Sequence, residues 1–378
     1  MIDKIIIAHD YLDGSASSNR VLCFAKGYRD NGKEVHLMLF APQGHQTLAI
    51  EGIHVRFFYE PDMPFRPLRR YIATKRYVKA IKDLYEPGKT AIHIYRTPWW
   101  GSFFNKKKYN FFYERGEVPF YSTTKFIAYK LQEYIGRSEA KNATGMLAQT
   151  HSLKEYYSKY GVKNCEVINM FVDTNRFRDL HVDKTTMYIA YCGTISKHKD
   201  GVDDLIKAFG IVHKERPEYK LYLIGAFEAL YGDEDYLRNL VKDMGLNDAV
   251  VFTGRVKPAE IPAYLANASI LALARPVNPQ TQYGFPTKLG EYLCTGNPIV
   301  LTNVGEIGMY MKDHANCVFA QPDNYQDFAE KLLWVIDNYD EAKKLGEAGC
   351  SLVESDFSIV EQTKKAIDFM ERVSNPKI

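Results

Sequence analysis

The sequence predicts an α/β protein with two domains, each built around a parallel β-sheet. Short apolar runs that suit buried strands alternate with helical segments, and this alternation begins twice, at Lys4 and again at Met187. Strand–helix–strand units of this kind favour parallel strands joined by right-handed crossovers. The length agrees, because 378 residues exceed one typical core and suit two domains of common size.

The elements of the first domain follow in a regular order. Lys4–His9 is an apolar run that predicts a buried strand, and the helix expected over 17–31 ends at Asn31-Gly32. Further strands are expected at 34–40, 109–113 and 143–149, and helices at 66–82, 123–140 and 151–160.

The second domain repeats the pattern after a linker. Residues 178–186 are polar and lack periodicity, so we place the boundary there, between a first domain, 1–180, and a second, 185–357. A last amphipathic helix is expected over 357–372. Within the second domain we expect strands at 187–192, 219–225, 249–253, 269–273 and 298–301, and helices at 202–214, 323–338 and 340–354.

Charge divides unevenly along the chain. Residues 1–186 carry 29 Lys and Arg against 19 Asp and Glu, or +10, whereas residues 187–378 carry 20 against 27, or −7. The near-neutral total of +3 therefore hides a dipolar molecule. The basic half suggests an anionic partner, such as a membrane surface or a diphosphate-linked acceptor, although scattered solvated lysines explain it equally well.

The six cysteines are widely spaced and form no Cys-x-x-Cys pair. This spacing argues for reduced, mostly buried thiols and against a zinc site or a disulfide framework. The chain opens without a signal-peptide pattern, and no 18 apolar residues run together. A cytoplasmic location is therefore expected.

The stretch 283–301 carries the most information about function. Gly284 and Pro286 mark a tight turn, with Pro286 expected as the first residue of a helix and Gly296 as its stop, before a short buried strand. Free amides at the helix start, together with the helix dipole, predict a diphosphate site. Glu291, less than two turns further on, can accept hydrogen bonds from a ribose diol. An ordinary capped core helix is the alternative interpretation.

This stretch resembles the nucleotide-sugar site of family 4 retaining glycosyltransferases, the glycosyl transferases group 1. In that family a loop and helix of the form Gly-Phe-x-x-x-x-x-Glu, followed by a small-x-Gly-x-Pro turn, holds the donor. Two glutamates usually stand eight positions apart; Glu291 matches the second, and Tyr283 stands in place of the first. The resemblance implies the GT-B fold, with two Rossmann-like parallel-sheet domains facing a central cleft. It also implies that the final helix, within 358–378, crosses back onto the first domain.

The resemblance further implies a donor site drawn from several loops. Lys199 matches the lysine of the family's phosphate loop, whereas Thr194 stands where an arginine is usual. Gly14 lies in the first loop, near the expected diphosphate, and Arg255 and Val256 match the turn beside the nucleotide base. As alternatives, Lys199 belongs to a chance lysine-rich loop, Gly14 to a polar turn, and Arg255 to the structural framework. The donor-binding candidates are Gly14, Thr194, Lys199, Arg255, Val256, Gly284, Phe285, Pro286, Thr287, Lys288 and Glu291.

Two residues are candidates for a catalytic role. Tyr283 takes the place of the first family glutamate. Glu114 follows a predicted strand, at the end where open α/β sheets bind ligands. By resemblance its loop occupies the place near the donor sugar where many relatives carry a histidine. A structural Glu114–Arg115 ion pair is the alternative. By resemblance no metal or separate cofactor is expected, and the leaving phosphate itself can take the acceptor proton.

The helix expected over 66–82 carries seven Lys and Arg and no acid, with apolar residues interleaved. Such a helix can lie on an anionic membrane, which would place the protein peripherally at the inner face. A solvated helix packed by its apolar stripe explains the pattern equally well. Nucleic acid is not indicated, because no helix-turn-helix, RNP or zinc pattern accompanies the charge.

The predicted function is transfer of a sugar, with retention, from a UDP- or GDP-sugar to a hydroxyl acceptor, in cell-surface polysaccharide or glycolipid assembly. A non-catalytic GT-B partner subunit is one alternative, which Tyr283 and Thr194 favour. A nucleotide-sugar epimerase on the same two-domain plan is a second, and a membrane-surface binding module is a third.

Overall fold

The structure is a computed structural model that describes residues 1–10, 12, 15–41, 47–95, 103–118, 126–228 and 232–374. The chain forms two compact units. The first comprises Met1–Phe171 together with Ser358–Ile378, and the second comprises Val172–Phe357. Among the described residues, no helix is both long and apolar enough to cross a membrane.

A parallel sheet forms the centre of the first unit. Its order among the described residues is β3-β2-β1-β4-β5-β6-β7, so the chain moves outward from β1 and then returns to the other side of β1. β1 and β4 are apolar and buried in the middle, as central parallel strands must be. The strands are β1 (Lys4–Asp10), β2 (Glu34–Ala41), β3 (Ile53–Tyr59), β4 (Thr90–Tyr95), β5 (Phe111–Arg115), β6 (Gly145–Ala148) and β7 (Cys165–Val167).

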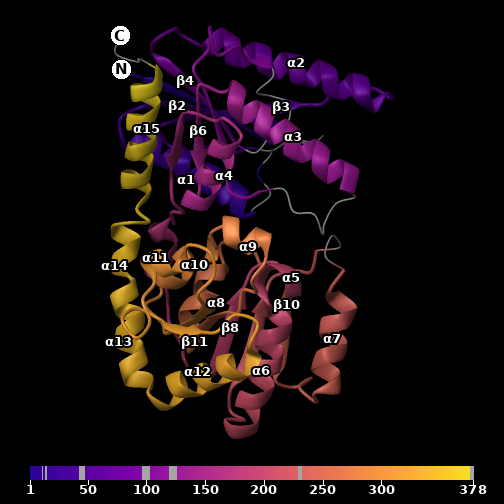
Figure 1. Ribbon diagram of the computed structural model, residues 1–378, viewed down its shortest axis with the longest axis vertical. Helices are drawn as coiled ribbons and strands as arrows, with labels where there is room; N and C mark the ends of the chain where they lie inside the picture. The colour runs from indigo at the N-terminus through magenta and orange to yellow at the C-terminus, as the bar shows by residue number, and fades with distance from the viewer. Residues whose placement is uncertain are drawn as a thin grey trace. The chain divides into compact units, whose positions relative to one another are not determined.

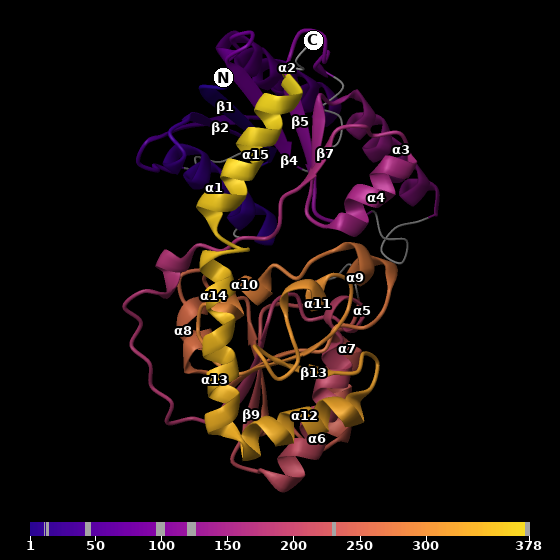
Figure 2. The same ribbon diagram turned by 60° about the vertical axis from the view of Figure 1, so that its left-hand side comes forward.

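Helices cover the two faces of this sheet (Figure 1). On one face, α1 and α15 pack side by side on an apolar core, and Asn31 Nδ2 donates a 3.0 Å hydrogen bond to Thr363 Oγ1 between them. Figure 2 shows α15 in front of the sheet beside α1. On the other face, the buried Tyr77 of α2 donates to the Met38 carbonyl of β2. The helices are α1 (Ala16–Asp30), α2 (Arg66–Leu84), α3 (Phe126–Asn142), α4 (His151–Lys159) and α15 (Ile359–Ser374).

The second unit is also doubly wound around a parallel sheet, of order β10-β9-β8-β11-β12-β13. Its first strand, β8, lies in the middle; the chain adds β9 and β10 on one side and then returns to place β11 on the other. The strand order therefore reverses between β8 and β11. The strands are β8 (Tyr188–Cys192), β9 (Lys220–Ile224), β10 (Val250–Gly254), β11 (Ile270–Leu273), β12 (Ile299–Thr302) and β13 (Val318–Ala320).

Short and long helices alternate with these strands. Asn324 caps one of the long helices, α12, by accepting a hydrogen bond from the Asp327 amide. The helices are α5 (Lys197–Asp200), α6 (Val202–Glu215), α7 (Glu234–Asp243), α8 (Ile261–Asn267), α9 (Pro279–Tyr283), α10 (Lys288–Leu293), α11 (Ile307–Tyr310), α12 (Tyr325–Asp337), α13 (Tyr339–Gly349) and α14 (Ser351–Glu354).

Among the boundaries that differ from those predicted, three concern the second unit. The second unit begins at Val172, before the polar segment 178–186, because a short 3-10 helix at 174–177 already packs on α8. The helix expected to start at Pro286 starts at Lys288, since the first turn closes through the Leu289 amide and the Pro286 carbonyl, 3.0 Å apart, at 3-10 spacing. The helix predicted over 340–354 is divided into α13 and α14.

Candidate functional site

The candidate site lies in the second unit, at the carboxyl ends of β8 and β11. Open parallel sheets bind ligands where the strand order reverses, because the loops leaving the two neighbouring strands diverge there. The loop after β8 leads into α5, and the loop after β11 leads into α9. Lys199 lies on α5. Two further charged residues that the sequence did not indicate are Asp200, at the end of α5, and Arg275, in the loop after β11.

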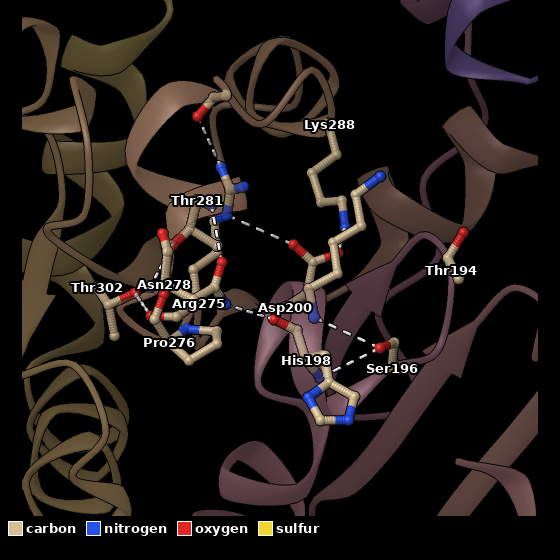
Figure 3. Close-up of polar contacts among 12 residues, drawn as sticks. Thr194, Ser196, His198, Asp200, Arg275, Pro276, Asn278, Thr281, Lys288 and Thr302 are labelled. Atoms are coloured by element: carbon tan, nitrogen blue, oxygen red, sulfur yellow. Dashed lines mark hydrogen bonds and ion pairs between the residues drawn. The ribbon is translucent and has the colours of Figure 1, made fainter. Parts of the chain in front are cut away.

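Asp200 is the centre of a buried charge cluster (Figure 3). Its carboxylate forms an ion pair with Lys288 and lies 3.6 Å from the Nε of Arg275. The Tyr191 hydroxyl lies 2.7 Å from Asp200 Oδ2 and accepts a 2.9 Å hydrogen bond from Lys288 Nζ. The side chains of Asp200 and Arg275 are almost fully buried, and that of Lys288 is 14% exposed. One carboxylate thus faces two cations.

The cluster shifts the acidity of its members. Burial raises the pKa of Asp200, but Lys288, Arg275 and Lys199 outweigh it and lower this pKa to about 2. Burial lowers the pKa of Lys288, and the Asp200 carboxylate opposes that change. Asp200 therefore stays ionised at neutral pH and holds the Lys288 ammonium in place. The cluster has an excess of positive charge, which suits an anionic ligand.

Glycines allow the backbone to come this close. Gly201, between α5 and α6, has φ +62°, and a Cβ there would lie 1.9 Å from the Ala274 carbonyl oxygen, so the β8 and β11 loops touch only because it is glycine. Gly193 follows β8 with φ +150°, and a Cβ there would lie 2.4 Å from Lys288 Nζ. Backbone atoms without a side chain therefore border the ammonium group.

Hydrogen bonds join the two loops around the cluster (Figure 3). Ser196 caps α5 by accepting from the amides of His198 and Lys199, and Asn278 Nδ2 donates to the His198 carbonyl at 2.7 Å. The Thr302 hydroxyl at the end of β12 donates to the Arg275 carbonyl at 2.7 Å. The loop positions are thus fixed by side chains from β12 and from both loops.

The predicted donor loop, 284–288, leads from α9 into α10. Gly284 and Pro286 are buried, and Phe285 is 8% exposed and packs against the rings of Tyr310 and Phe357. The amides of Thr287 and Lys288 precede the first hydrogen bond of α10, which Leu289 donates. Phe285 is therefore a packing residue, while Thr287 and Lys288 are at the helix start.

Glu291 lies on α10 and forms an ion pair with Arg176. Both side chains are partly exposed, at 17% for Glu291 and 24% for Arg176, and Arg176 also donates to the Pro258 carbonyl at 2.8 Å. The carboxylate predicted to bind ribose thus has a cationic partner that orients it.

The other predicted donor residues have different surroundings. Thr194, at the position of the family arginine, donates a 2.9 Å hydrogen bond to Glu228. Arg255 is exposed after β10, and Val256 is half-buried beside it. Tyr283 is half-buried at the end of α9, and Gly14 lies outside the described residues.

Glu114 belongs to the first unit and is fully buried there. Its Oε1 accepts from Arg20 Nε at 2.5 Å, and its Oε2 lies 2.8 Å from His93 Nε2. Burial raises the pKa of Glu114, but Arg20 and His93 outweigh it and hold the pKa below its usual value. The sequence suggested Arg115 as the ion-pair partner. Successive strand residues point to opposite faces, and Arg115 instead donates to the Tyr113 hydroxyl at 2.8 Å.

The second unit also matches a known protein family, and the chain has relatives among curated proteins. Residues 172–351, nearly the whole of the second unit, match the family described as glycosyl transferases group 1. The chain is 25% identical over 171 residues to the D-inositol 3-phosphate glycosyltransferase of Paenarthrobacter aurescens, covering 45% of this chain and 40% of that protein. It is 27% identical over 145 residues to the mannosylfructose-phosphate synthase of Agrobacterium fabrum, covering 37% and 31%. The chain thus matches less than half the length of these relatives.

Solved structures are similar over almost the whole chain. The structure of Anabaena Alr3699/HepE in complex with UDP and glucose aligns with a TM-score of 0.74 at 15% identity, covering 97% of this chain and 99% of that one. The sucrose-phosphate synthase of Thermosynechococcus elongatus aligns with a TM-score of 0.75 at 14% identity, covering 99% of both. These likenesses confirm the predicted fold class, GT-B with two parallel-sheet units.

Proposed function

We propose that the protein is a retaining glycosyltransferase that moves a sugar from a UDP- or GDP-sugar to a hydroxyl acceptor, in cell-surface polysaccharide or glycolipid assembly. The observation that carries this proposal is the Lys288 ammonium, held by Asp200 and bordered by Gly193, at the strand-order reversal of a group 1 domain. The complex of the structural relative with UDP and glucose adds support for a nucleotide-sugar donor.

The chemistry follows from charge at the donor phosphate. When the bond between the anomeric carbon and the phosphate oxygen breaks, the electron pair goes to the nucleoside diphosphate. Lys199, Lys288 and the Thr287 amide lie at one loop cluster and can stabilise that charge. The acceptor oxygen bonds to the anomeric carbon on the face that the phosphate leaves, and its proton passes to the leaving phosphate. No metal or separate cofactor takes part in this proposal.

Glu291 completes the donor site by accepting hydrogen bonds from the ribose hydroxyls. Its ion pair with Arg176 fixes the direction of the carboxylate, so the residue is pre-oriented for a diol. Tyr283 and Glu114 remain the predicted catalytic candidates, although the buried partners of Glu114 favour a structural role.

Lys199→Ala is expected to weaken binding of a nucleoside diphosphate by about ten-fold or more, and to leave nucleoside binding nearly unchanged. A hydrogen bond to a charged group contributes about 1.5–3 kcal/mol, and only the diphosphate offers that charge. Calorimetric titrations with UDP, GDP, uridine and guanosine measure this difference. Lys197→Ala is the matched control, because Lys197 lies on the same short helix but its ammonium is 3.9 Å from Asp233. Equal losses for nucleoside and nucleotide would mean that Lys199 only shapes the loop.

The competing functions give different results with the purified protein. A glycosyltransferase releases nucleoside diphosphate slowly from its cognate nucleotide sugar and faster with an acceptor. An epimerase converts the sugar without any acceptor, and a partner subunit does neither. Incubation with a panel of UDP- and GDP-sugars, followed by chromatography of nucleotide and sugar, therefore separates the three. Absence of turnover together with absence of donor binding would overturn the proposal.

We also propose that α2 places the protein on anionic membrane. Five of its basic side chains are exposed, whereas Arg69 pairs with Glu60 at 2.7 Å and Lys82 lies over aromatic rings. Three large apolar side chains are exposed beside them: Phe65 at 64%, Leu68 at 41% and Tyr71 at 51%. Cations next to apolar side chains suit the lipid headgroup boundary. The exposed cations are Arg66, Arg70, Lys75, Arg76 and Lys79.

The protein is expected to sediment with anionic vesicles at low salt and to be released at high salt. Each Lys or Arg near such a surface contributes about 1 kcal/mol, and the attraction fades over about 8 Å at physiological salt. Arg70→Glu with Arg76→Glu should abolish sedimentation. Lys214→Glu with Lys344→Glu, exposed residues of the second unit, is the matched control with the same charge change. Equal binding to neutral and anionic vesicles would contradict the electrostatic mechanism. Binding to neither kind of vesicle would mean that the basic side chains of α2 are only solvated.

A further inference from the structure

A group of metal-ligating side chains lies at the amino-terminal ends of β2 and β3 in the first unit. It consists of Glu34, His36 and His54, and none of the donor-site residues belongs to it. One ligand atom of each residue lies within 4.8 Å of the other two. We propose that these three residues form a binding site for a divalent cation of the zinc class. The ion would join β3, an edge strand of the sheet, to its neighbour β2.

The strand register brings the three side chains together. His36 and His54 are direct partners across the parallel pair β2 and β3, so their side chains leave the same face of the sheet. Glu34 lies two residues before His36 and therefore shares that face. The two imidazole rings stack with centroids 4.7 Å apart and planes inclined by 23°, and His36 Nε2 lies 2.6 Å from Glu34 Oε1.

The spacing of the ligand atoms suits one ion. Three atoms at most 4.8 Å apart have a common point within about 2.8 Å of each, which is 4.8 Å divided by √3. Zinc bonds to histidine nitrogen and carboxylate oxygen are about 2.0–2.2 Å long. Small rotations of the three side chains close that difference, since Glu34 and His54 are exposed.

The surroundings keep this end of the sheet open. Tyr77 of α2 packs on the same face further along, where it contacts the Met38 carbonyl and the ring of Phe58. Arg56, the next residue of β3 on this face, places its guanidinium 5.0 Å from the Phe58 ring centroid. A cation can therefore approach from solvent: the Glu34 side chain is 48% exposed and that of His36 13%.

Lys4 is the competing charge near the site. Its ammonium lies 3.8 Å from Glu34 Oε1, and it also forms an ion pair with Glu86. Because Glu86 neutralises Lys4, Glu34 can serve a metal ion without leaving Lys4 unpaired.

The donor set selects the class of ion. Two imidazoles with one carboxylate suit zinc and neighbouring first-row metals, whereas magnesium and calcium prefer oxygen ligands alone. Three protein ligands leave a position for water. An ion bound here links two neighbouring strands and stabilises the folded unit by its binding free energy.

Titration calorimetry of the full chain with zinc chloride tests the site. We expect one site in the original protein, and a loss of affinity of at least about ten-fold in His36→Gln and in His54→Gln, since even the outer partners of metal ligands contribute 10–100-fold. His181→Gln, an exposed histidine of the second unit, is the matched control and should bind zinc as the original does. His54 is exposed, so its variant is expected to fold even if the His36 variant does not.

Thiols are the competing zinc ligands, and Cys294 and Cys350 are the half-buried ones. Cobalt(II) distinguishes them, because a thiolate ligand gives an intense near-ultraviolet charge-transfer band that imidazole and carboxylate do not. We expect no such band, unchanged zinc affinity in Cys294→Ser with Cys350→Ser, and a zinc-dependent rise in melting temperature that His54→Gln abolishes. Zinc affinity that survives in His54→Gln, or that depends on the cysteines, would overturn the proposal.

Discussion

Asp200→Asn is expected to lower the free energy of unfolding of the second unit by about 3–5 kcal/mol, the cost of removing one partner from a buried ion pair. The carboxylate is 2% exposed and faces both Lys288 and Arg275. Asparagine keeps the shape of the side chain but removes its charge. Two buried cations then lie next to each other without compensation, and their mutual repulsion adds to the loss.

Thermal unfolding followed by calorimetry measures the effect, with Tyr191→Phe as the control. That variant removes a hydroxyl that contacts Asp200 and Lys288 but leaves every charge in place, and it should cost only about 0.5–1.5 kcal/mol. Adding Lys288→Met to Asp200→Asn should recover part of the loss, because the double variant has one uncompensated cation fewer. A small effect of Asp200→Asn, within that of Tyr191→Phe, would contradict a central role for this ion pair.

The pH dependence of stability follows from the same residue. The pKa of Asp200 is lowered from 3.8 to about 2. A carboxyl with a depressed pKa contributes stability above its unfolded value, and the contribution is lost as pH falls from about 3.8 to about 2. Other carboxylates titrate in this range, so the informative quantity is the difference in the free energy of unfolding between the original protein and Asp200→Asn. That difference should shrink as pH falls from about 3.8 to about 2.

The regular elements were predictable because their signals are local. The apolar run at Lys4–His9 and the asparagine–glycine end of the first helix depend on neighbouring residues, and the structure has β1 and α1 there. The turn at 284–288 was predictable for the same reason, since glycine, proline and lysine stand together in sequence. The start of α10 was placed two residues early, because proline is compatible both with a helix start and with the turn before it.

The charge cluster was not predictable, because its members are brought together only by the sheet order. Asp200 and Lys288 are 88 positions apart. Arg275 follows β11, which lies next to β8 although β9 and β10 come between them in the chain. A buried arginine after a strand has no spacing pattern that marks it in one sequence. The same holds for His36 and His54, whose pairing depends on the register of two parallel strands.

Glu114→Gln is expected to destabilise the first unit by about 3–5 kcal/mol, for the same reason as at Asp200. Glu114 is fully buried, and Arg20 beside it is 4% exposed. The amide cannot neutralise the guanidinium, although Arg20 keeps its hydrogen bonds to the carbonyls of Ile168 and Asn169. Chemical denaturation monitored at the first unit measures the change, and Glu155→Gln, at an exposed position on α4, should be neutral.

This variant also separates the two roles predicted for Glu114. If Glu114 is structural, its replacement lowers stability, while the fraction of protein that stays folded keeps its donor hydrolysis and transfer rates. If Glu114 is catalytic, its replacement lowers the transfer rate at temperatures where the protein is fully folded. Because Arg20 and His93 occupy both carboxylate oxygens, we expect the first result. Unchanged stability with lost transfer would instead show that Glu114 acts on the sugar, and its buried partners would then serve to set its charge.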